Sequence, residues 1–336
     1  LALGAMKTGK PVRICYSRTE SMQSTTKRHP SDIKLTIGAT EAGKIMGFNF
    51  YGEFDTGAYA SWGPTVANRV PVHASGPYEI PDYRAESKGI HTNNPPAGAF
   101  RGFGVPQSAI AQECLFDELA QKLDIDPLEF RIINALKNNI PTVCGQVFSQ
   151  GVGITKCLRA LRPAWLQENE NCATFNAANT VLSRGVGIAS GWYGCGNTSL
   201  PNPSTIKSGI RADGTVVLHQ GAMDIGQGAN TVITQIFATA LGVSIDKIKL
   251  IGADTDVTPD AGKTSASRQT YVSGNAARLS GSTLRRCILD KLNVAQDSVL
   301  AIDAGVINAT DSSGEHTLSL ATLCADAEGY VLRAEE

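Results

Sequence analysis

Two glycines alternate with aromatic and basic residues in segment 99–107, which reads AFRGFGVPQ. Gly102 and Gly104 have no Cβ, so the backbone there can adopt a positive φ and approach a large ligand closely. A long amphipathic stretch follows, and N–H groups beside a helix start are ready donors for anionic atoms. Phe100 and Phe103 add an apolar wall beside these donors. The pattern predicts a site that holds its ligand mainly through the main chain.

A second glycine-rich segment, 221–231, reads GAMDIGQGANT and lies between a strand-like run and a helix-like run. Gln227 stands between Gly226 and Gly228 at this junction. Its amide offers both donors and an acceptor, which suits the polar edge of a ring. The segment therefore predicts a further polar contact to a ring-containing ligand.

A third segment, 263–270, reads KTSASRQT and opens the longest helix that the sequence predicts. Ser265, Ser267 and Arg268 bring two hydroxyls and a guanidinium to this helix start. Hydroxyls, an arginine and a helix N-terminus together suit a phosphate group. The segment is therefore interpreted as a phosphate-binding loop.

The composition is that of a folded chain without a strong charge. The 336 residues suffice for two domains, and 42% are hydrophobic while 18% are charged. A net charge of −1 favours neither nucleic acid nor an anionic membrane surface as a partner. Segment 27–29, KRH, is expected to be a solvated turn. No apolar run approaches the roughly 20 residues of a membrane-spanning helix.

The eight cysteines form no C-x-x-C pair, and their scatter suits neither zinc nor an iron–sulfur cluster. We expect reduced, mostly buried thiols and a cytoplasmic location. No set of side chains has the spacing of metal ligands, so no protein-held metal is predicted. The cysteines are Cys15, Cys114, Cys144, Cys157, Cys172, Cys195, Cys287 and Cys324.

The first half of the chain predicts a β-hairpin followed by two helices. Residues 32–40 and 44–53 flank the turn residues EAG. Residues 106–123 predict a helix, and Asp126 and Pro127 start another as N-cap and first helical position. The apolar face expected for the first helix carries Ile110, Cys114, Leu115, Leu119 and Leu123.

The second half repeats a mixture of strands and helices. Residues 184–190 predict a strand, and residues 229–241 predict a helix. The polar, glycine-containing stretch 138–152 predicts a boundary that divides the chain into residues 1–145 and 146–336. The expected fold is α+β, with two mixed α/β subdomains.

In order and spacing, AFRGFGVPQ, DIGQG and TSASRQTYVSGNA resemble the molybdenum-cofactor-binding region of the xanthine dehydrogenase and aldehyde oxidoreductase family. The opening MKTGKPV at 6–12 and DPLEFR at 126–131 extend the resemblance over nearly the whole chain. It implies molybdopterin, in the cytosine dinucleotide form, bound between two subdomains. The molybdenum would be held by the pterin dithiolene and not by protein side chains.

The resemblance also implies roles for individual residues. By this resemblance, Phe103 would be the aromatic side chain that packs against the substrate, and Arg69 would be a substrate-facing arginine. Phe100 and Arg101 contact the ligands of the molybdenum largely through backbone, and Gln227 hydrogen-bonds one such ligand. The implied cofactor-binding residues are Phe100, Arg101, Gly102, Gly226, Gln227, Gly228, Ser265, Ser267, Arg268 and Gln269.

The implied activity is hydroxylation of an aromatic N-heterocycle, such as a purine or nicotinate, with water as the oxygen source. [2Fe–2S] clusters and FAD would lie on other domains or subunits, which are the expected partners. A glycine-rich phenylalanine loop upstream of Met6 and a Gly-Glu-Pro segment with the catalytic base are absent from this sequence. We therefore expect no catalytic base in this chain and no turnover without the remaining segments of the molybdenum subunit.

Two alternatives stay open on the sequence alone. One is oxidation of aldehydes to carboxylates by the same kind of site. The other is a non-catalytic, cofactor-free assembly fragment, against which the three glycine- and hydroxyl-rich loops argue.

Overall fold

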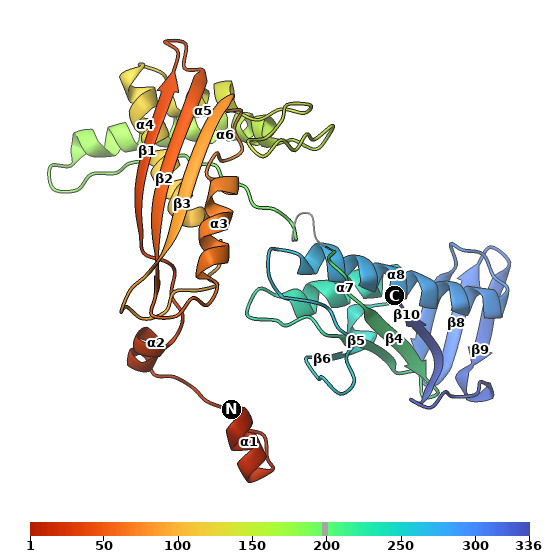
Figure 1. Ribbon diagram of the computed structural model, residues 1–336. Helices are drawn as coiled ribbons and strands as arrows, with labels where there is room; N and C mark the ends of the chain where they lie inside the picture. Colours follow the sequence, from red (N-terminus) through yellow and green to blue (C-terminus); the bar gives the residue numbers. More distant parts are fainter. Residues whose placement is uncertain (197–200) are drawn as a thin grey trace. The chain divides into compact units, whose positions relative to one another are not determined.

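The computed structural model describes residues 1–196 and 201–336, which form two compact units (Figure 1). The first unit comprises Leu1–Tyr193 and the second Gly194–Glu336. Each unit contains a mixed sheet with helices packed on it, so the predicted α+β fold of two mixed subdomains is confirmed.

A three-stranded sheet in the order β1-β2-β3 forms the centre of the first unit. β1 and β2 form the predicted antiparallel hairpin. Gly43 lies in the turn between these two strands and has a φ of 79°. β3 pairs parallel to β2. The elements that open this unit are α1 (Ala2–Thr8), α2 (Arg18–Ser24), β1 (Ser31–Ala39), β2 (Ile45–Gly57) and β3 (Asp82–His91).

Helices pack on one face of this sheet. Phe48, Phe50 and Phe54 alternate along β2 and are buried against Val70 and Phe116 of two of these helices. A period of two places these three rings on the same face, as expected for a half-buried strand. The helices are α3 (Gly63–His73), α4 (Val105–Lys122) and α5 (Pro127–Asn134).

The fourth large helix of the unit, α6 (Ile154–Ala178), continues through Pro163 and packs on α5. Leu128, Ala135 and Leu158 form a small core between these helices. Because of this packing, the compact unit extends to Tyr193, beyond the predicted boundary at 145/146. That boundary, as a border between family domains, stays a prediction.

The second unit is built on a four-stranded sheet in the order β10-β4-β5-β6. β5 pairs antiparallel to β4 and parallel to β6, and β10 pairs antiparallel to β4. A separate antiparallel sheet has the order β7-β8-β9. The strands are β4 (Ile206–Arg211), β5 (Val216–Gln220), β6 (Ile248–Gly252), β7 (Val299–Asp303), β8 (Val306–Asp311), β9 (Gly314–Ser319) and β10 (Tyr330–Glu335).

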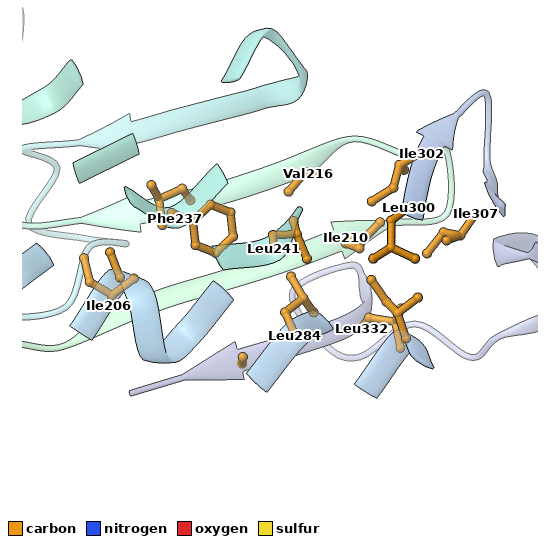
Figure 2. Packing of buried hydrophobic residues seen from close by; sticks show 14 of the residues in the cluster. Ile206, Ile210, Val216, Phe237, Leu241, Leu284, Leu300, Ile302, Ile307 and Leu332 are labelled. Carbon is orange, nitrogen blue, oxygen red and sulfur yellow. The ribbon is translucent and has the colours of Figure 1, made fainter. Parts of the chain in front are cut away.

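Two helices, α7 (Ala229–Leu241) and α8 (Gln269–Leu292), share the core of the second unit with both of its sheets. Figure 2 shows Phe237 and Leu241 of α7 packed among strand residues, with Leu284 of α8 beside them. Leu300 and Ile307 of the second sheet close the same core. This packing anchors the helices whose N-termini carry the second and third loops. Short 3₁₀ helices at Ile245–Lys247 and Leu320–Thr322 complete the unit.

Two local expectations are wrong. Residues 184–190 form no strand, because Ile188 packs against the α5–α6 core and needs no strand partner to bury it. The apolar face predicted for α4 is wrong at two of its five positions, because Ile110 is 69% exposed and Cys114 is exposed, whereas Leu119 and Leu123 pack against the core. The helix instead buries polar Glu113, which pairs with the fully buried Arg131.

The cysteines differ from expectation in burial. All eight are free thiols, as predicted, but six are exposed and two are intermediate, so the expectation of mostly buried thiols is wrong. Within the described ranges, no helix is both long and apolar enough to cross a bilayer.

Candidate functional site

The first loop, residues 99–104, leads into α4 through three consecutive residues with positive φ. Gly102, Phe103 and Gly104 have φ values of 94°, 51° and 87°. The Phe103 amide donates to the Phe100 carbonyl, and the Val105 amide donates to the Gly102 carbonyl at 2.8 Å. These bonds fold the loop tightly just before the helix start, as the glycine pattern predicts.

Packing explains why glycine is needed at Gly104. A Cβ there would lie 2.7 Å from Cγ2 of Val70 and 3.2 Å from the carbonyl oxygen of Val66, both in α3. At Gly102 a Cβ would lie 2.5 Å from Cγ of Pro106. The close backbone approach predicted at these glycines therefore serves contacts within the unit itself.

Several side chains of the first loop face outward. Phe100 is 45% exposed and Arg101 is exposed. Phe103 is half-buried and meets Trp62 edge-on, with ring centroids 6.1 Å apart. Edge-to-face contact of this kind is a favourable aromatic geometry. The loop thus combines a fixed main chain with aromatic surface that remains accessible.

Arg28 belongs to this site, although the sequence pattern suggested only a solvated turn at 27–29. Its guanidinium lies 4.6 Å from the Phe100 ring centroid and donates to the Arg101 carbonyl. The neighbouring His29 is 2% exposed, and burial lowers its pKa. No spacing rule links residue 28 to residue 100, so no local signal could have found this contact.

Arg69 lies on α3, the helix against which the first loop packs. Its guanidinium is 5.7 Å from the Tyr193 ring centroid, and His73 stacks on that ring at 5.2 Å. The Trp192 indole donates to the His73 carbonyl at 3.2 Å. Burial is the main cause that lowers the His73 pKa. Arg69 therefore lies in an aromatic cluster with a buried histidine.

The second loop is held by a carboxylate that the sequence analysis missed. Asp224 Oδ1 accepts from the Gly226 amide at 2.9 Å, and Oδ2 accepts from the Asn230 amide at 3.1 Å. These amides, with Asn230 first, hold the Asp224 pKa below its usual range. Asp224 thus occupies the N-terminus of α7, where the helix dipole favours a negative charge. An acidic residue shortly before a predicted helix start was the available signal.

Gln227 folds back onto its own loop. Its Oε1 accepts from the Ile225 amide at 2.6 Å, and its Nε2 donates to the Met223 carbonyl at 3.0 Å. Gly226 and Gly228 have φ values of 99° and 81°. A Cβ at either glycine would meet none of the described atoms within 4 Å. The loop is therefore bent by positive φ while the space around both glycines stays open.

The third loop lies beside the second. Thr264 Oγ1 accepts from the Met223 amide at 3.0 Å. Arg268 is 2% exposed, and its guanidinium donates to the carbonyls of Ala261, Lys263 and Pro203. Gln269 is also buried and donates to the Lys263 carbonyl at 3.0 Å. Both of these predicted cofactor residues hold the loop in shape.

Ser265 and Ser267 differ from those two neighbours. Ser265 is half-buried, Ser267 is exposed, and neither hydroxyl bonds a residue within the described ranges. The first amides of α8, at Gln269, Thr270 and Tyr271, likewise have no acceptor among the residues that the structure describes. Hydroxyls and unpaired helix amides form a donor set that suits an anion such as phosphate. The donor chemistry of this loop therefore fits a phosphate-bearing cofactor.

Across residues 1–196 and 201–336, no three His, Cys, Asp or Glu side chains are grouped closely enough to hold a metal ion. A cavity of about 460 Å³ in the first unit is lined by Asp117, Asp126 and Trp165, among others, and by none of the predicted site residues. The three loops themselves offer main-chain donors, hydroxyls and aromatic rings.

Comparison with known proteins assigns these loops to a family. Two models described as molybdopterin cofactor-binding domain match residues 1–135 and 160–336. A putative xanthine dehydrogenase molybdenum-binding subunit of Escherichia coli is 34% identical over 330 residues, covering 95% of this chain and 43% of that protein. The nicotinate dehydrogenase large molybdopterin subunit of Eubacterium barkeri is 42% identical over 161 residues, or 48% of this chain and 38% of that protein.

Solved structures agree with this similarity. The aldehyde oxidoreductase from Desulfovibrio desulfuricans matches with a TM-score of 0.80 and 27% identity, covering 99% of this chain and 34% of that chain. The chain spans 31 to 43% of the length of the first curated relatives that it matches.

Proposed function

Because the chain belongs to the molybdopterin cofactor-binding domains of the xanthine dehydrogenase and aldehyde oxidoreductase family, we propose that its three loops hold a molybdenum–pterin cofactor. One observation carries this proposal. The Ser265 and Ser267 hydroxyls and the first amides of α8 have no acceptor among the described residues, and they lie beside the bent second loop. Together with the two hydroxyls, these amides are donors that a phosphate can accept from, which favours a cofactor-binding role over that of a cofactor-free assembly fragment.

Each loop is proposed to contact a different part of the cofactor. Ser265, Ser267 and the first amides of α8 are the proposed phosphate donors, while Arg268 and Gln269 fix the loop from within. The backbone of Phe100, Arg101 and Gly102 is proposed to meet the metal end of the cofactor. Gly226, Gln227 and Gly228 are proposed to supply a polar contact, for which the Gln227 amide must exchange its internal bonds for bonds to the cofactor.

The proposed reaction is hydroxylation of an aromatic N-heterocycle with water as the oxygen source. When bound, a molybdenum–pterin group supplies the two-electron redox chemistry, and the protein supplies binding and orientation. Phe103 is proposed to pack against the substrate ring and Arg69 to face its polar edge. The names of the nicotinate and xanthine dehydrogenase relatives support a heterocycle.

Aldehyde oxidation is the second candidate, because an aldehyde oxidoreductase shares the fold over 99% of this chain. In either case we propose the cytosine dinucleotide form of the cofactor. Iron–sulfur and flavin domains or subunits are the proposed electron-transfer partners. A cytoplasmic location, which free thiols favour, stays a prediction.

A substrate screen of the holoprotein with an artificial electron acceptor tests the reaction. We expect turnover of purines or pyridine carboxylates to exceed that of aldehydes. Phe103→Ala should lower turnover while molybdenum content stays unchanged, with the exposed Arg84→Ala as a control in the same unit. Loss of the metal in Phe103→Ala would show that the ring holds the cofactor instead, and faster turnover of aldehydes would select the second candidate.

A further inference from the structure

Segment 27–29 runs along the first loop from a distant part of the chain. The Lys27 amide donates to the Pro96 carbonyl at 3.2 Å, and the Gly98 amide donates back to Lys27 at 3.0 Å. This isolated parallel bridge joins Lys27 and Ala97. The main chain of the segment is therefore fixed at the entrance to the loop, and Arg28 starts from an anchored position.

The Arg28 side chain then reaches across the loop. It lies against the Phe100 ring at 4.6 Å and donates to the Arg101 carbonyl. A further guanidinium nitrogen lies 3.4 Å from Oε1 of Gln107 in the first turn of α4. One planar side chain thus touches the loop at its ring, at its backbone and at the helix that follows. An arginine can do this because its donors point in several fixed directions.

Gln107 secures the other side of this arrangement. It is 8% exposed, and its Nε2 donates to the His29 carbonyl at 3.1 Å. The same amide therefore binds the backbone of residue 29 and faces the guanidinium of residue 28. Segment 27–29, the first loop and the start of α4 form one connected unit.

The charge of the Arg28 guanidinium is not paired with an acidic side chain among the described residues. Among the described residues, no carboxylate lies within ion-pair distance of its guanidinium. Its charge-assisted bond is therefore made to a backbone carbonyl of the loop, and such bonds are stronger than neutral ones. An arginine used only for surface solubility would not be half-buried against an aromatic ring and a carbonyl.

We propose that Arg28 is a positioning residue, which sets the backbone at Phe100 and Arg101 so that this backbone meets the molybdenum end of the cofactor. The inference rests on the proposed function for the cofactor, but the hold of Arg28 on the loop does not. Without the guanidinium, the Arg101 carbonyl loses its donor and the Phe100 ring loses its partner. The loop then samples other conformations, although the glycines still fold it.

The test compares wild type, Arg28→Ala, Arg28→Lys and the control Arg84→Ala in the holoprotein. Hydrogen exchange of a peptide covering residues 98–107 reports the loop directly. We expect Arg28→Ala to speed exchange there about tenfold, as loss of one charge-assisted hydrogen bond implies. The exchange rate in Arg28→Lys should lie between those of wild type and Arg28→Ala, because an ammonium cannot serve both acceptors in the same geometry. Arg84→Ala should match wild type.

Kinetics and spectroscopy separate positioning from mere stability. We expect Arg28→Ala to lower kcat per bound molybdenum about tenfold, with KM changed less than twofold and an altered electron paramagnetic resonance signal of the molybdenum. An unchanged signal and an unchanged kcat per molybdenum, with a lower unfolding temperature, would overturn the inference. If Arg28→Ala does not fold, Arg28→Lys decides by the same criteria.

The two proposals fail in different ways. Absence of molybdenum from the wild-type holoprotein would contradict the proposed function, while faster exchange in Arg28→Ala would still show that Arg28 holds the loop. Wild-type exchange in both Arg28 variants would overturn the inference and leave the cofactor proposal standing.

Discussion

The first loop, before α4, and the second loop, before α7, look alike in sequence but are held in different ways. Gly104 is pressed against Val70 of another helix, and Arg28 reaches the first loop from a distant segment. The second loop is held by its own Asp224 and Gln227, and its glycines face open space. Similar glycine patterns therefore have different structural causes. In the first loop glycine allows close packing, and in the second loop it allows the chain to turn.

A similar contrast exists within the third loop. Some of its side chains hold the loop in shape, while others are exposed and could donate to a ligand. Arg268 is enclosed by carbonyls, while Ser267, next to it, is exposed. Residue type alone assigned both to phosphate binding. We propose that burial separates them, because the Arg268 guanidinium is 2% exposed and donates to three backbone carbonyls, whereas the Ser267 hydroxyl is open to a ligand.

The largest expected effect is that of Arg268→Ala. Three carbonyls would lose a charged donor and a buried volume would be left empty, so the second unit should lose about 4 kcal/mol of unfolding free energy. Denaturant unfolding of the variant measures this. A loss below about 1 kcal/mol would mean that the arginine is free for a ligand, and the contrast with Ser267 would disappear.

Gly104→Ala should have the next largest effect. The new Cβ would meet Val70 at 2.7 Å, and the φ of 87° is unfavourable for alanine. Overpacking and backbone strain together should cost about 3 kcal/mol. Thermal unfolding of the first unit checks this prediction. Adding the substitution Val70→Ala to the same variant should recover part of the lost stability.

Gly228→Ala should cost less, although its φ of 81° is similar. No described atom lies within 4 Å of the new Cβ, so only backbone strain of about 1 kcal/mol remains. The same unfolding measurement applies. Equal losses for Gly104→Ala and Gly228→Ala would break the comparison between the two loops.

The smallest effect concerns pH. Backbone amides lower the Asp224 pKa in the folded chain, so its contribution is present above the pKa of an unfolded aspartate and is lost as pH falls through the lower folded value. Asp224→Asn should therefore reduce stability near neutral pH and leave it less changed in acid. Exposure to solvent keeps this effect small. Hydrogen exchange at the start of α7, measured against pH, reports it.

The sequence predicted well what local patterns control. The hairpin at Gly43, the Asp126 cap of α5 and the start of α7 at Ala229 all follow from turn chemistry and periodicity, and the structure confirms them. Each depends on residues a few positions apart. The positive φ at Gly102 and Gly104 belongs to the same class.

What the sequence could not predict depends on distant partners. The buried face of α4 carries Glu113 because Arg131, itself 0% exposed, pairs with it across the helix contact. Hydrophobic periodicity therefore placed Leu119 and Leu123 correctly against the core but included the exposed Ile110 and missed Glu113. Arg28 was missed for the same reason, since its partners lie more than 70 residues further along the chain.

The central claim is that glycine-rich loops with unpaired donors hold a molybdenum–pterin cofactor. Its most direct test is the molybdenum and pterin content of the purified holoprotein, compared with that of a Ser265→Ala/Ser267→Ala double variant. We predict about one molybdenum and one pterin dinucleotide per wild-type chain, and a clear reduction of both in the double variant. A wild-type protein that holds neither molybdenum nor pterin would contradict the account.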